Sequence, residues 1–188
     1  MNFLFISRFT VLHKFELVFM MLVVVLILIY FFPKVNCKSK KRHIRNINKS
    51  KEILFKMNQF EGVNKEARII AYLRKIDPYI FEELLLEALL KKGFKITRNE
   101  RYSGDGGIDG KAYFREQLYF IQAKRYKKYV SAQHLENFQT VVGDKKGLFI
   151  HTGKTGKDTY EKYKRTNIEI VSGRRLIDLI LTNESPDK

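Results

Sequence analysis

The hydrophobic positions from residue 77 onward follow first a helical period and then several strand periods. Between Pro78 and Gly93 apolar residues recur every three or four positions, the spacing of a helix with one buried face. Asp77 is a favourable N-cap, proline is tolerated at the first helical position, and Gly93 suits a left-handed C-terminal cap. This pattern predicts a core helix from Asp77 to Gly93.

Short apolar runs after this helix predict strands at 94–98, 108–114, 118–124, 147–151 and 168–171. Helical periods predict helices at 131–142, with Ser131 as N-cap, and at 157–165 and 174–181. The run LYFIQAK at 118–124 starts with consecutive apolar residues, which is typical of a central strand buried on both faces. The order αβββαβαβα predicts an α/β fold in which a mixed β-sheet is flanked by helices on both faces.

The first part of the chain has a different pattern. The uncharged run LVFMMLVVVLILIYFF from Leu17 to Phe32 spans roughly 24 Å as a helix at about 1.5 Å per residue. Extension to Val35 brings it near the thickness of a bilayer core, about 30 Å. We therefore expect residues 1–35 to be a membrane anchor with one transmembrane helix. A cleaved signal peptide is the alternative, but no small-residue cleavage site follows the run.

Two amphipathic patterns follow the apolar run, one capped by Ser50 and one beginning after Asn64. We expect residues 36–76 to be a basic linker and helical stalk. Basic residues are dense from Lys34 to Lys51 and sparse before the apolar run, a bias that places the following domain in the cytoplasm. We therefore expect a single-pass membrane protein whose C-terminal domain lies in the cytoplasm.

The formal net charge of +16 favours a polyanionic partner, either nucleic acid or an anionic membrane surface. The single cysteine, Cys37, excludes an intrachain disulfide and a metal centre built from several thiolates of one chain. A metal ion would therefore have to be bound by oxygen or nitrogen ligands.

Polar residues converge in the hairpin predicted between 108–114 and 118–124. If its turn is formed by residues 115–116, antiparallel pairing places Asp109 directly across from Gln122. Gln122 and Lys124 are two positions apart, so they project from the same face of their strand. The sequence thus predicts a cluster of three polar groups at one edge of a buried sheet.

This cluster has the chemistry of a metal-dependent hydrolase. The Asp109 carboxylate, the Gln122 amide oxygen and the backbone carbonyl of Ala123 can bind a hard divalent cation. Lys124 can orient a water molecule or offset charge on a reacting phosphate. The same spacing also occurs where a buried strand simply ends in polar residues at the solvent.

Several motifs agree in order and spacing with one known family. They are Phe81-Glu82 in the first core helix, GDGGIDG at 104–110, IQAKRY at 121–126, GLFIHT at 147–152 and IVSGRRLIDLI from 170. Together these segments resemble the Mrr-like branch of the type IV restriction endonucleases, within the PD-(D/E)XK nuclease superfamily. The resemblance covers Pro78 to Leu181. It implies a restriction-endonuclease-like αβββαβ core, Mg²⁺ dependence with Mn²⁺ as a substitute, and cleavage of double-stranded DNA.

The resemblance also implies roles for individual residues. Asp109 looks like the metal-binding aspartate, Gln122 takes the place of the second acid, and Lys124 is the motif lysine. Glu82 resembles the helix-borne acid that supports the metal shell. Glu83 and Glu87 lie on the same helix, so which of the three acids is aimed at the site stays open.

Other polar residues near these motifs have a functional and a structural interpretation. Arg125, Lys127 and Lys128 could bind a DNA backbone beside the metal, although a basic loop is more often simply solvated. His151 and His134 are more typical of structural histidines. Asp105 belongs to a glycine-rich turn that we interpret as structural.

We therefore expect a nuclease domain at 77–182 followed by a tail at 183–188. Mrr-type enzymes carry a separate DNA-recognition domain where this chain has its anchor and stalk, so recognition of methylated DNA does not transfer. The expected function is a membrane-anchored endonuclease that restricts foreign or modified DNA, with homodimer formation as one way to cut both strands. The alternatives are a catalytically silent DNA-binding module tethered to the membrane and a membrane-surface scaffold.

Overall fold

The computed structural model describes the backbone of residues 3–99 and 107–181, with side chains described from 16–27 and from residue 40 onward within those ranges. The chain divides into two compact units, Met1–His43 and Ile44–Lys188. Helix α1 (Phe3–Asn58) begins in the first unit and ends in the second.

The first unit contains the N-terminal part of α1, in which the apolar side chains from Leu17 to Ile27 are exposed. Among the described residues, no helix is both long enough and apolar enough to cross a membrane. The transmembrane helix expected from the sequence is therefore not supported.

Residues 44–76 of the segment expected to be a linker and stalk belong to the second unit, and several of their apolar side chains lie in its core. Ser50 does not cap a new helix: it is buried inside α1, and its hydroxyl donates to the carbonyl of Ile47 at 2.7 Å. Helix α2 (Lys65–Leu73) follows a turn. The apolar faces of the end of α1 and of α2 lie in the main hydrophobic core, through Ile53, Leu54, Met57, Ile69 and Leu73. The stalk interpretation did not take into account that an amphipathic helix buries its apolar face against a neighbouring hydrophobic core.

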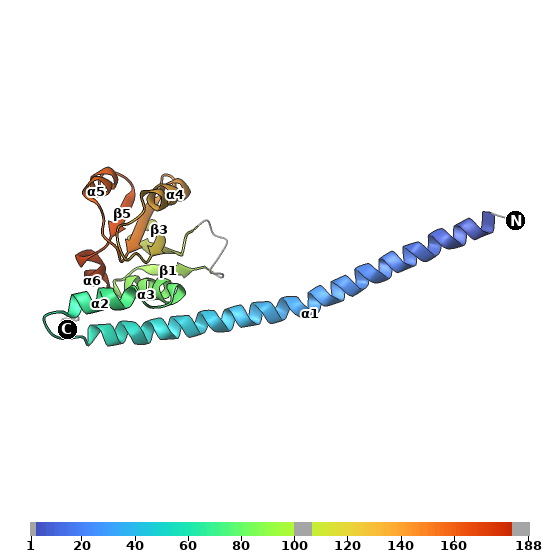
Figure 1. The fold of residues 1–188 in the computed structure, drawn as a ribbon, viewed down its shortest axis with the longest axis horizontal. Coiled ribbons are helices and arrows are strands. Elements are labelled where there is room, and N and C mark those ends of the chain that lie inside the picture. Colours follow the sequence, from blue (N-terminus) through green and yellow to red (C-terminus); the bar gives the residue numbers. More distant parts are fainter. Residues whose placement is uncertain (1–2, 100–106, 182–188) are drawn as a thin grey trace. The chain divides into compact units, whose positions relative to one another are not determined.

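The sheet has five strands in the order β1-β2-β3-β4-β5 (Figure 1). The first three strands form an antiparallel meander, and the last two continue from β3 in parallel. Their bounds are β1 (Lys95–Arg98), β2 (Gly110–Phe114), β3 (Gln117–Lys124), β4 (Lys146–His151) and β5 (Ile168–Val171). The expected mixed sheet and the central place of β3 are confirmed.

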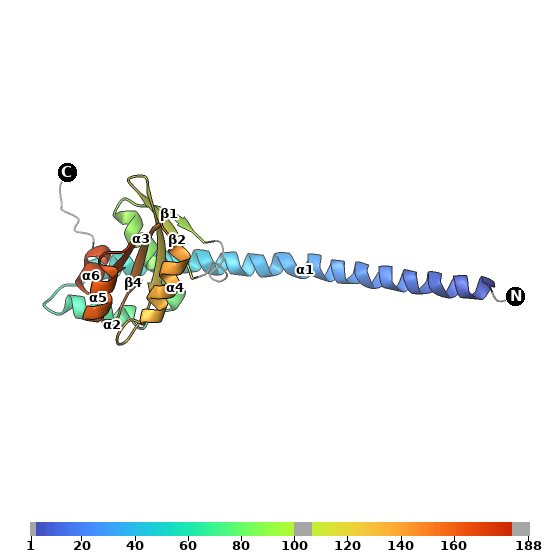
Figure 2. The same cartoon turned by 90° about the horizontal axis from the view of Figure 1, so that it is seen from above.

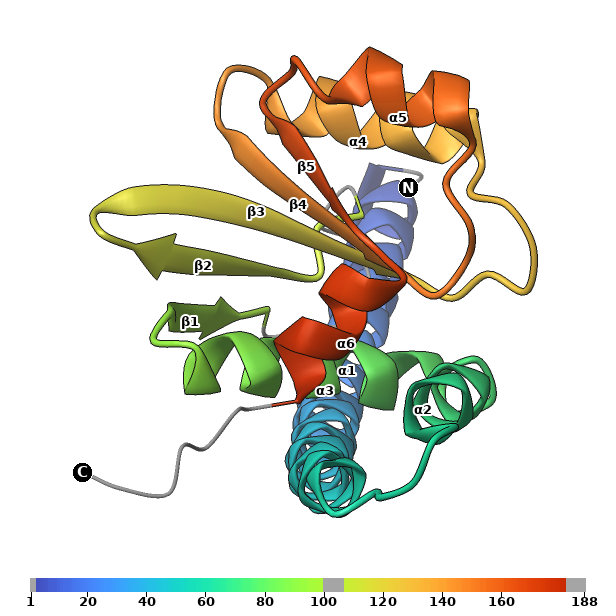
Figure 3. The same cartoon turned by 90° about the vertical axis from the view of Figure 1, so that its left-hand side faces the viewer.

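Helices cover both faces of this sheet (Figures 1 and 3). One face carries α3 (Pro78–Lys91) and α6 (Arg174–Ile180), together with α2 and the end of α1. The other carries α4 (Ala132–Val142) and α5 (Lys157–Tyr163), and Figure 2 shows these elements from above. Two hydrophobic clusters fill the spaces: Ile121 and Ala123 of β3 belong to the α3 side, whereas Phe120 packs on the α4 side.

Local signals explain where α3 begins and ends. The Asp77 carboxylate accepts hydrogen bonds from the backbone N–H groups of Tyr79 at 2.9 Å and Ile80 at 3.3 Å. Gly93 has a φ of +89°, the left-handed conformation expected after the helix. Both predictions are confirmed. Ser131 is the N-cap residue of α4, as predicted, but its side chain makes no cap hydrogen bond.

Candidate active site

Asp109 precedes β2, at the point where the β2–β3 ladder becomes irregular. The hairpin turns at Arg115 and Glu116, as predicted, and the register from Phe114↔Gln117 to Gly110↔Ile121 is confirmed. At Asp109 the ladder shifts, because the Asp109 N–H donates to the carbonyl of Ile121 at 2.8 Å. The prediction that Asp109 lies directly across from Gln122 is therefore wrong in detail. Such bulge-like irregularities redirect a side chain.

The redirected Asp109 carboxylate meets the end of β3. Its Oδ2 accepts a hydrogen bond from the backbone N–H of Ala123 at 2.7 Å. Ala123 stands between Gln122 and Lys124, so the carboxylate reaches the backbone of the predicted cluster. Asn99 holds the segment in front of it, since its side-chain amide donates to the carbonyl of Ile108.

Gln122 has a buried acceptor without a partner. Its Nε2 donates to the carbonyl of Gly107 at 2.6 Å, which fixes the orientation of the amide because a carbonyl can only accept. Its Oε1 is buried and has no hydrogen-bond partner among the residues that the structure describes. Gly107 is required at this contact, because a Cβ there would lie 2.7 Å from Nε2 and its φ is +87°. Residues 104–106 of the glycine-rich turn, including Asp105, lie outside the described residues.

Glu82 on α3 is the helix acid whose charge interacts with Asp109 and Lys124 of this cluster. The pKa of Glu82 is raised to about 8, first by burial and then by the nearby Asp109 carboxylate, against the opposing effect of Lys124. Burial also raises the pKa of Asp109 to about 6, against the opposing effects of the Ala123 N–H and of Lys124. Two carboxyls and one ammonium group therefore share a desolvated region in which negative charge is under-compensated.

The other two acids of α3 have structural partners. Arg98 donates from Nε to Glu83 Oε2 at 3.0 Å, and its Nη2 pairs with Glu87. Both carboxylates are buried, and Lys51 adds a longer contact of 3.9 Å to Glu87. Of the three helix acids that the sequence left open as candidates for the site, Glu82 is therefore the one that remains. Arg98 itself was not singled out from the sequence, because a single arginine in a strand carries no signal of its partners.

The end of β3 is held in a rigid frame. The Thr152 N–H donates to the carbonyl of Lys124 at 3.3 Å, and Arg74 donates to the carbonyl of Thr152 from Nε at 3.1 Å and from Nη2 at 2.8 Å. Arg125 donates to the carbonyls of Arg74 and Ile76. The Arg125 side chain thus binds backbone carbonyls of the protein itself. These contacts do not support its predicted role in contacting DNA.

Lys127 and Lys128 are exposed on a loop that is paired with the loop after β4. The Lys154 N–H donates to the carbonyl of Lys128 at 2.9 Å, and the Val130 N–H donates to the carbonyl of Lys154 at 2.9 Å. Tyr129 is 64% exposed on the same loop. The result is a fixed basic surface directly after Lys124, formed by Lys127, Lys128, Tyr129 and Lys154, which we call the two-loop platform.

The histidines have structural surroundings. His151 is fully buried; its Nδ1 accepts from the Gly153 N–H at 3.2 Å and its Nε2 lies 3.1 Å from Thr155 Oγ1. Burial lowers the pKa of His151 to about 4, so the ring is neutral at physiological pH. His134 forms a hydrogen bond with the hydroxyl of Tyr126. These contacts agree with the structural interpretation of both residues.

The donor set fits a divalent cation. Within the described part of the chain no group of three or more His, Cys, Asp or Glu side chains could hold a metal. The cluster instead offers two carboxyls, Glu82 and Asp109, and the unpartnered amide oxygen of Gln122. A buried acceptor without a donor and two carboxyls with raised pKa values are all stabilised by a cation.

A comparison with protein families decides the classification. The family model Mrr_cat, described as restriction endonuclease, matches residues 73–180. The chain belongs to this family. The matched region is therefore a domain of the restriction endonuclease family, as the motifs indicated, and Asp109, Gln122 and Lys124 all lie inside it. No curated protein matches the chain.

Among solved structures, the chain is similar to one described as "MspJI Restriction Endonuclease in Complex with 27-mer Oligonucleotide". The identity is 20%, the TM-score is 0.47, and the match covers 63% of this chain and 32% of that chain. The chain thus matches about a third of the length of that enzyme.

Proposed function

We propose that the second unit is a divalent-metal-dependent DNA endonuclease that hydrolyses phosphodiester bonds at Glu82, Asp109, Gln122 and Lys124. The observation that carries the proposal is the buried Oε1 of Gln122, which has no hydrogen-bond partner among the described residues and lies in a cluster whose carboxyls have raised pKa values. Leaving such an acceptor without a donor costs about 1–3 kcal/mol. A stable fold tolerates this cost where a ligand satisfies the group.

Each residue has a proposed role. Glu82, Asp109, the Gln122 amide oxygen and the Ala123 carbonyl hold the cation, with Mg²⁺ or Mn²⁺ suited to such oxygen donors. When bound, the metal polarises the phosphoryl group and lowers the pKa of a water molecule. Lys124 offsets negative charge on the reacting phosphate, and its backbone is held by the hydrogen bond from the Thr152 N–H to its carbonyl.

The two-loop platform supports DNA as the substrate. Lys127, Lys128 and Lys154 are exposed cations on a rigid backbone that continues directly from the strand of Lys124. Cations arranged in this way bind phosphates independently of base sequence and position a duplex beside the site. Restriction of foreign or modified DNA is the biological role that this chemistry suggests. Membrane localisation and homodimer formation stay predictions of the sequence.

A nicking assay tests the proposed function. The full-length chain is incubated with methylated and unmethylated supercoiled plasmid in Mg²⁺, in Mn²⁺ and in chelator. We expect metal-dependent nicking that falls about 100-fold or more in Asp109→Asn and in Lys124→Met. Lys91→Met is the matched control, because this lysine is exposed in the last turn of α3, and it should cut like the parent chain.

Three results would contradict the proposal. Nicking that persists in chelator, or that is unchanged in Asp109→Asn, would mean that the cleavage has another source. Salt-sensitive retention of DNA without cleavage in any metal would favour the catalytically silent DNA-binding module. Circular dichroism of each variant separates loss of chemistry from loss of fold.

A further inference from the structure

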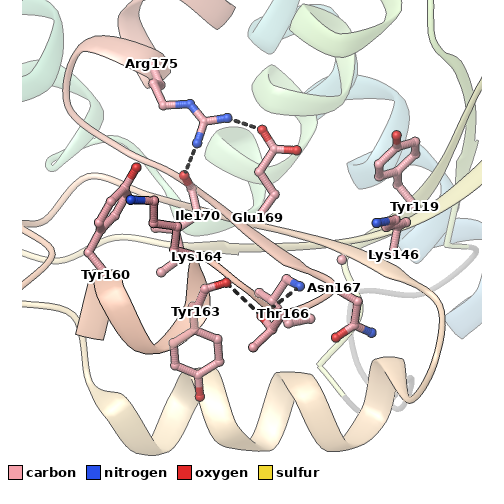
Figure 4. A pocket seen from close by; sticks show the side chains of 12 residues that line it. Tyr119, Lys146, Tyr160, Tyr163, Lys164, Thr166, Asn167, Glu169, Ile170 and Arg175 are labelled. Carbon is pink, nitrogen blue, oxygen red and sulfur yellow. Dashed lines mark hydrogen bonds and ion pairs between the residues drawn. The ribbon is translucent and has the colours of Figure 1, made fainter. Parts of the chain in front are cut away.

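A second hollow lies at the opposite end of the sheet from the catalytic cluster. It has a volume of about 290 Å³ and is formed where β4 and β5 begin and α5 ends (Figure 4). Tyr119, on its wall, precedes Lys124 by about 17 Å along β3 at about 3.3 Å per residue. The hollow is therefore separate from the site described above.

Two walls of the hollow each carry a tyrosine next to a lysine. On one wall, Tyr160 and Lys164 are one helical turn apart on α5, and the Lys164 N–H donates to the Tyr160 carbonyl at 2.9 Å. On the other wall, Tyr119 of β3 is the register partner of Lys146 of β4. Figure 4 shows these pairs on opposite sides, with Asn167 and Glu169 between them.

The charge of the hollow is positive. Neither Lys146 nor Lys164 forms an ion pair with any residue in the described ranges. Glu169, the acid of the lining, is already neutralised by an ion pair with Arg175, whose Nη1 also donates to the carbonyl of Ile170 at 2.8 Å. The two lysines are therefore left to bind an external anion.

The aromatic groups indicate what kind of anion this is. Tyr160 is 46% exposed, so a face of its ring is open to a ligand. Exposed aromatic rings alternating with cations form the usual platform for single-stranded nucleic acid, in which unpaired bases stack and phosphates meet lysine or arginine. Duplex DNA does not use such a platform, because its bases are already stacked on each other.

We propose that this hollow binds single-stranded DNA, with a base stacking on Tyr160 and phosphates bound by Lys164 and Lys146, while Tyr119 stays packed edge-on against Phe94. Its volume admits about one nucleotide, at the small end of ligand cavities of roughly 300–1,000 Å³. The strand continues along both walls. This binding needs no cleavage, so it goes beyond the proposed function and can be tested separately from it.

Two measurements on the full-length chain in chelator test the proposal. The first is the affinity for a fluorescein-labelled 12-nucleotide thymidine strand, measured by anisotropy. Tyr160→Ala/Lys164→Ala should weaken binding about 10-fold or more, whereas Tyr160→Phe, which keeps the ring, should bind like the parent chain. The matched control is Tyr72→Ala/Lys91→Ala, which removes an exposed tyrosine and an exposed lysine elsewhere and should not change the affinity.

The second measurement locates the strand. An oligonucleotide that contains 5-iodouracil is cross-linked by light, and the modified residues are found by mass spectrometry. Cross-links at Tyr160 are expected. Equal affinity of the hollow variant and the control, or cross-links only at other residues such as Tyr129 of the two-loop platform, would overturn the proposal. Circular dichroism and thermal unfolding show whether each variant is folded.

Discussion

The carboxylate of Asp109 accepts a hydrogen bond from the backbone N–H of Ala123 at 2.7 Å, which ties the residue before β2 to the end of β3. This bond sets the geometry of the candidate active site, because Ala123 separates Gln122 from Lys124. It exists because the ladder shifts at Asp109 and turns the carboxylate toward the neighbouring strand. The consequences can be measured without knowing the preferred DNA substrate.

Glu82 makes the metal-free protein less stable as pH rises. Its pKa is raised from 4.5 to about 8, so the folded state binds more protons than the unfolded state between these values and loses stability as pH increases. Below about pH 6.5, His151 acts in the opposite direction, because its folded pKa is lowered to about 4. We therefore expect the melting temperature in chelator to fall between pH 6.5 and 8.

Calorimetry across that pH range checks the expectation. The fall should be about 1–3 °C, since Glu82 is only partly buried. Glu82→Gln should remove it, whereas Glu52→Gln, which changes an exposed acid on α1, should leave it in place. A melting temperature that rises steadily to pH 8 in the parent chain would show that the ionised form of Glu82 is not disfavoured in the folded state.

Gln122→Glu should lower the stability of the metal-free protein and raise its affinity for a divalent metal. The new carboxylate cannot donate to the Gly107 carbonyl, and it adds a third acid to the cluster of Asp109 and Glu82. We expect the free energy of unfolding in chelator to fall by about 1–3 kcal/mol, and saturating Mg²⁺ to restore it.

Gln122→Leu is the control for this experiment, because it has no oxygen to offer to a cation. It should show a smaller stabilisation by Mg²⁺ than the parent chain when both are unfolded by denaturant. If the Glu and Leu variants responded equally to Mg²⁺, position 122 would not contact the metal.

Arg98 should be far more important for stability than a surface arginine. Arg98→Met leaves the buried acids Glu83 and Glu87 without their main partner, and we expect a loss of about 3–5 kcal/mol. Arg174→Met is the matched control: its ion pairs to Glu66 at 3.6 Å and Asp178 at 3.4 Å are formed by a side chain that is 76% exposed. It should cost about 0–1 kcal/mol in urea unfolding. Similar losses for the two variants would contradict the structural role given to Arg98.

The core predicts where the chain can be shortened. A chain that starts at Asp77 lacks Ile53, Leu54, Met57, Ile69 and Leu73, all buried in the main core. Each such side chain contributes about 1.5–3 kcal/mol, so their sum rivals the whole stability of a domain, about 5–15 kcal/mol. We expect residues 44–188 to unfold cooperatively on heating and residues 77–188 not to do so. Cooperative unfolding of the shorter chain would mean that α1 and α2 are dispensable.

The sequence predicted the sheet well because local signals were strong. The N-cap at Asp77 and the apolar run of β3 each have one favourable structural solution, and the hairpin turn at 115–116 fixes the register of β2 and β3. The motifs around Asp109 and Lys124 identified the family before any geometry was known. Glu82 could be separated from Glu83 and Glu87 only in three dimensions, because all three occupy one helix and differ in the partners that other elements supply.

The errors have a common physical cause. The ladder shift at Asp109 lies beside a close tertiary contact that the sequence does not reveal: a Cβ at Gly110 would lie 2.8 Å from Leu86 Cδ2 of α3. The burial of α1 and α2 and the capture of Arg125 by backbone carbonyls are also long-range effects. Periodicity shows that a helix has an apolar face, but not which surface covers it.

Affinity cleavage by iron tests the central claim most directly. Fe²⁺ replaces Mg²⁺ at oxygen-rich sites, and with ascorbate and peroxide it generates radicals that cut the polypeptide next to the bound metal. We expect cuts near Glu82, Asp109 and Gln122–Ala123 that are suppressed by excess Mg²⁺ and absent in Asp109→Asn. Cuts confined to other parts of the chain, or unchanged in that variant, would show that these residues do not bind a common cation.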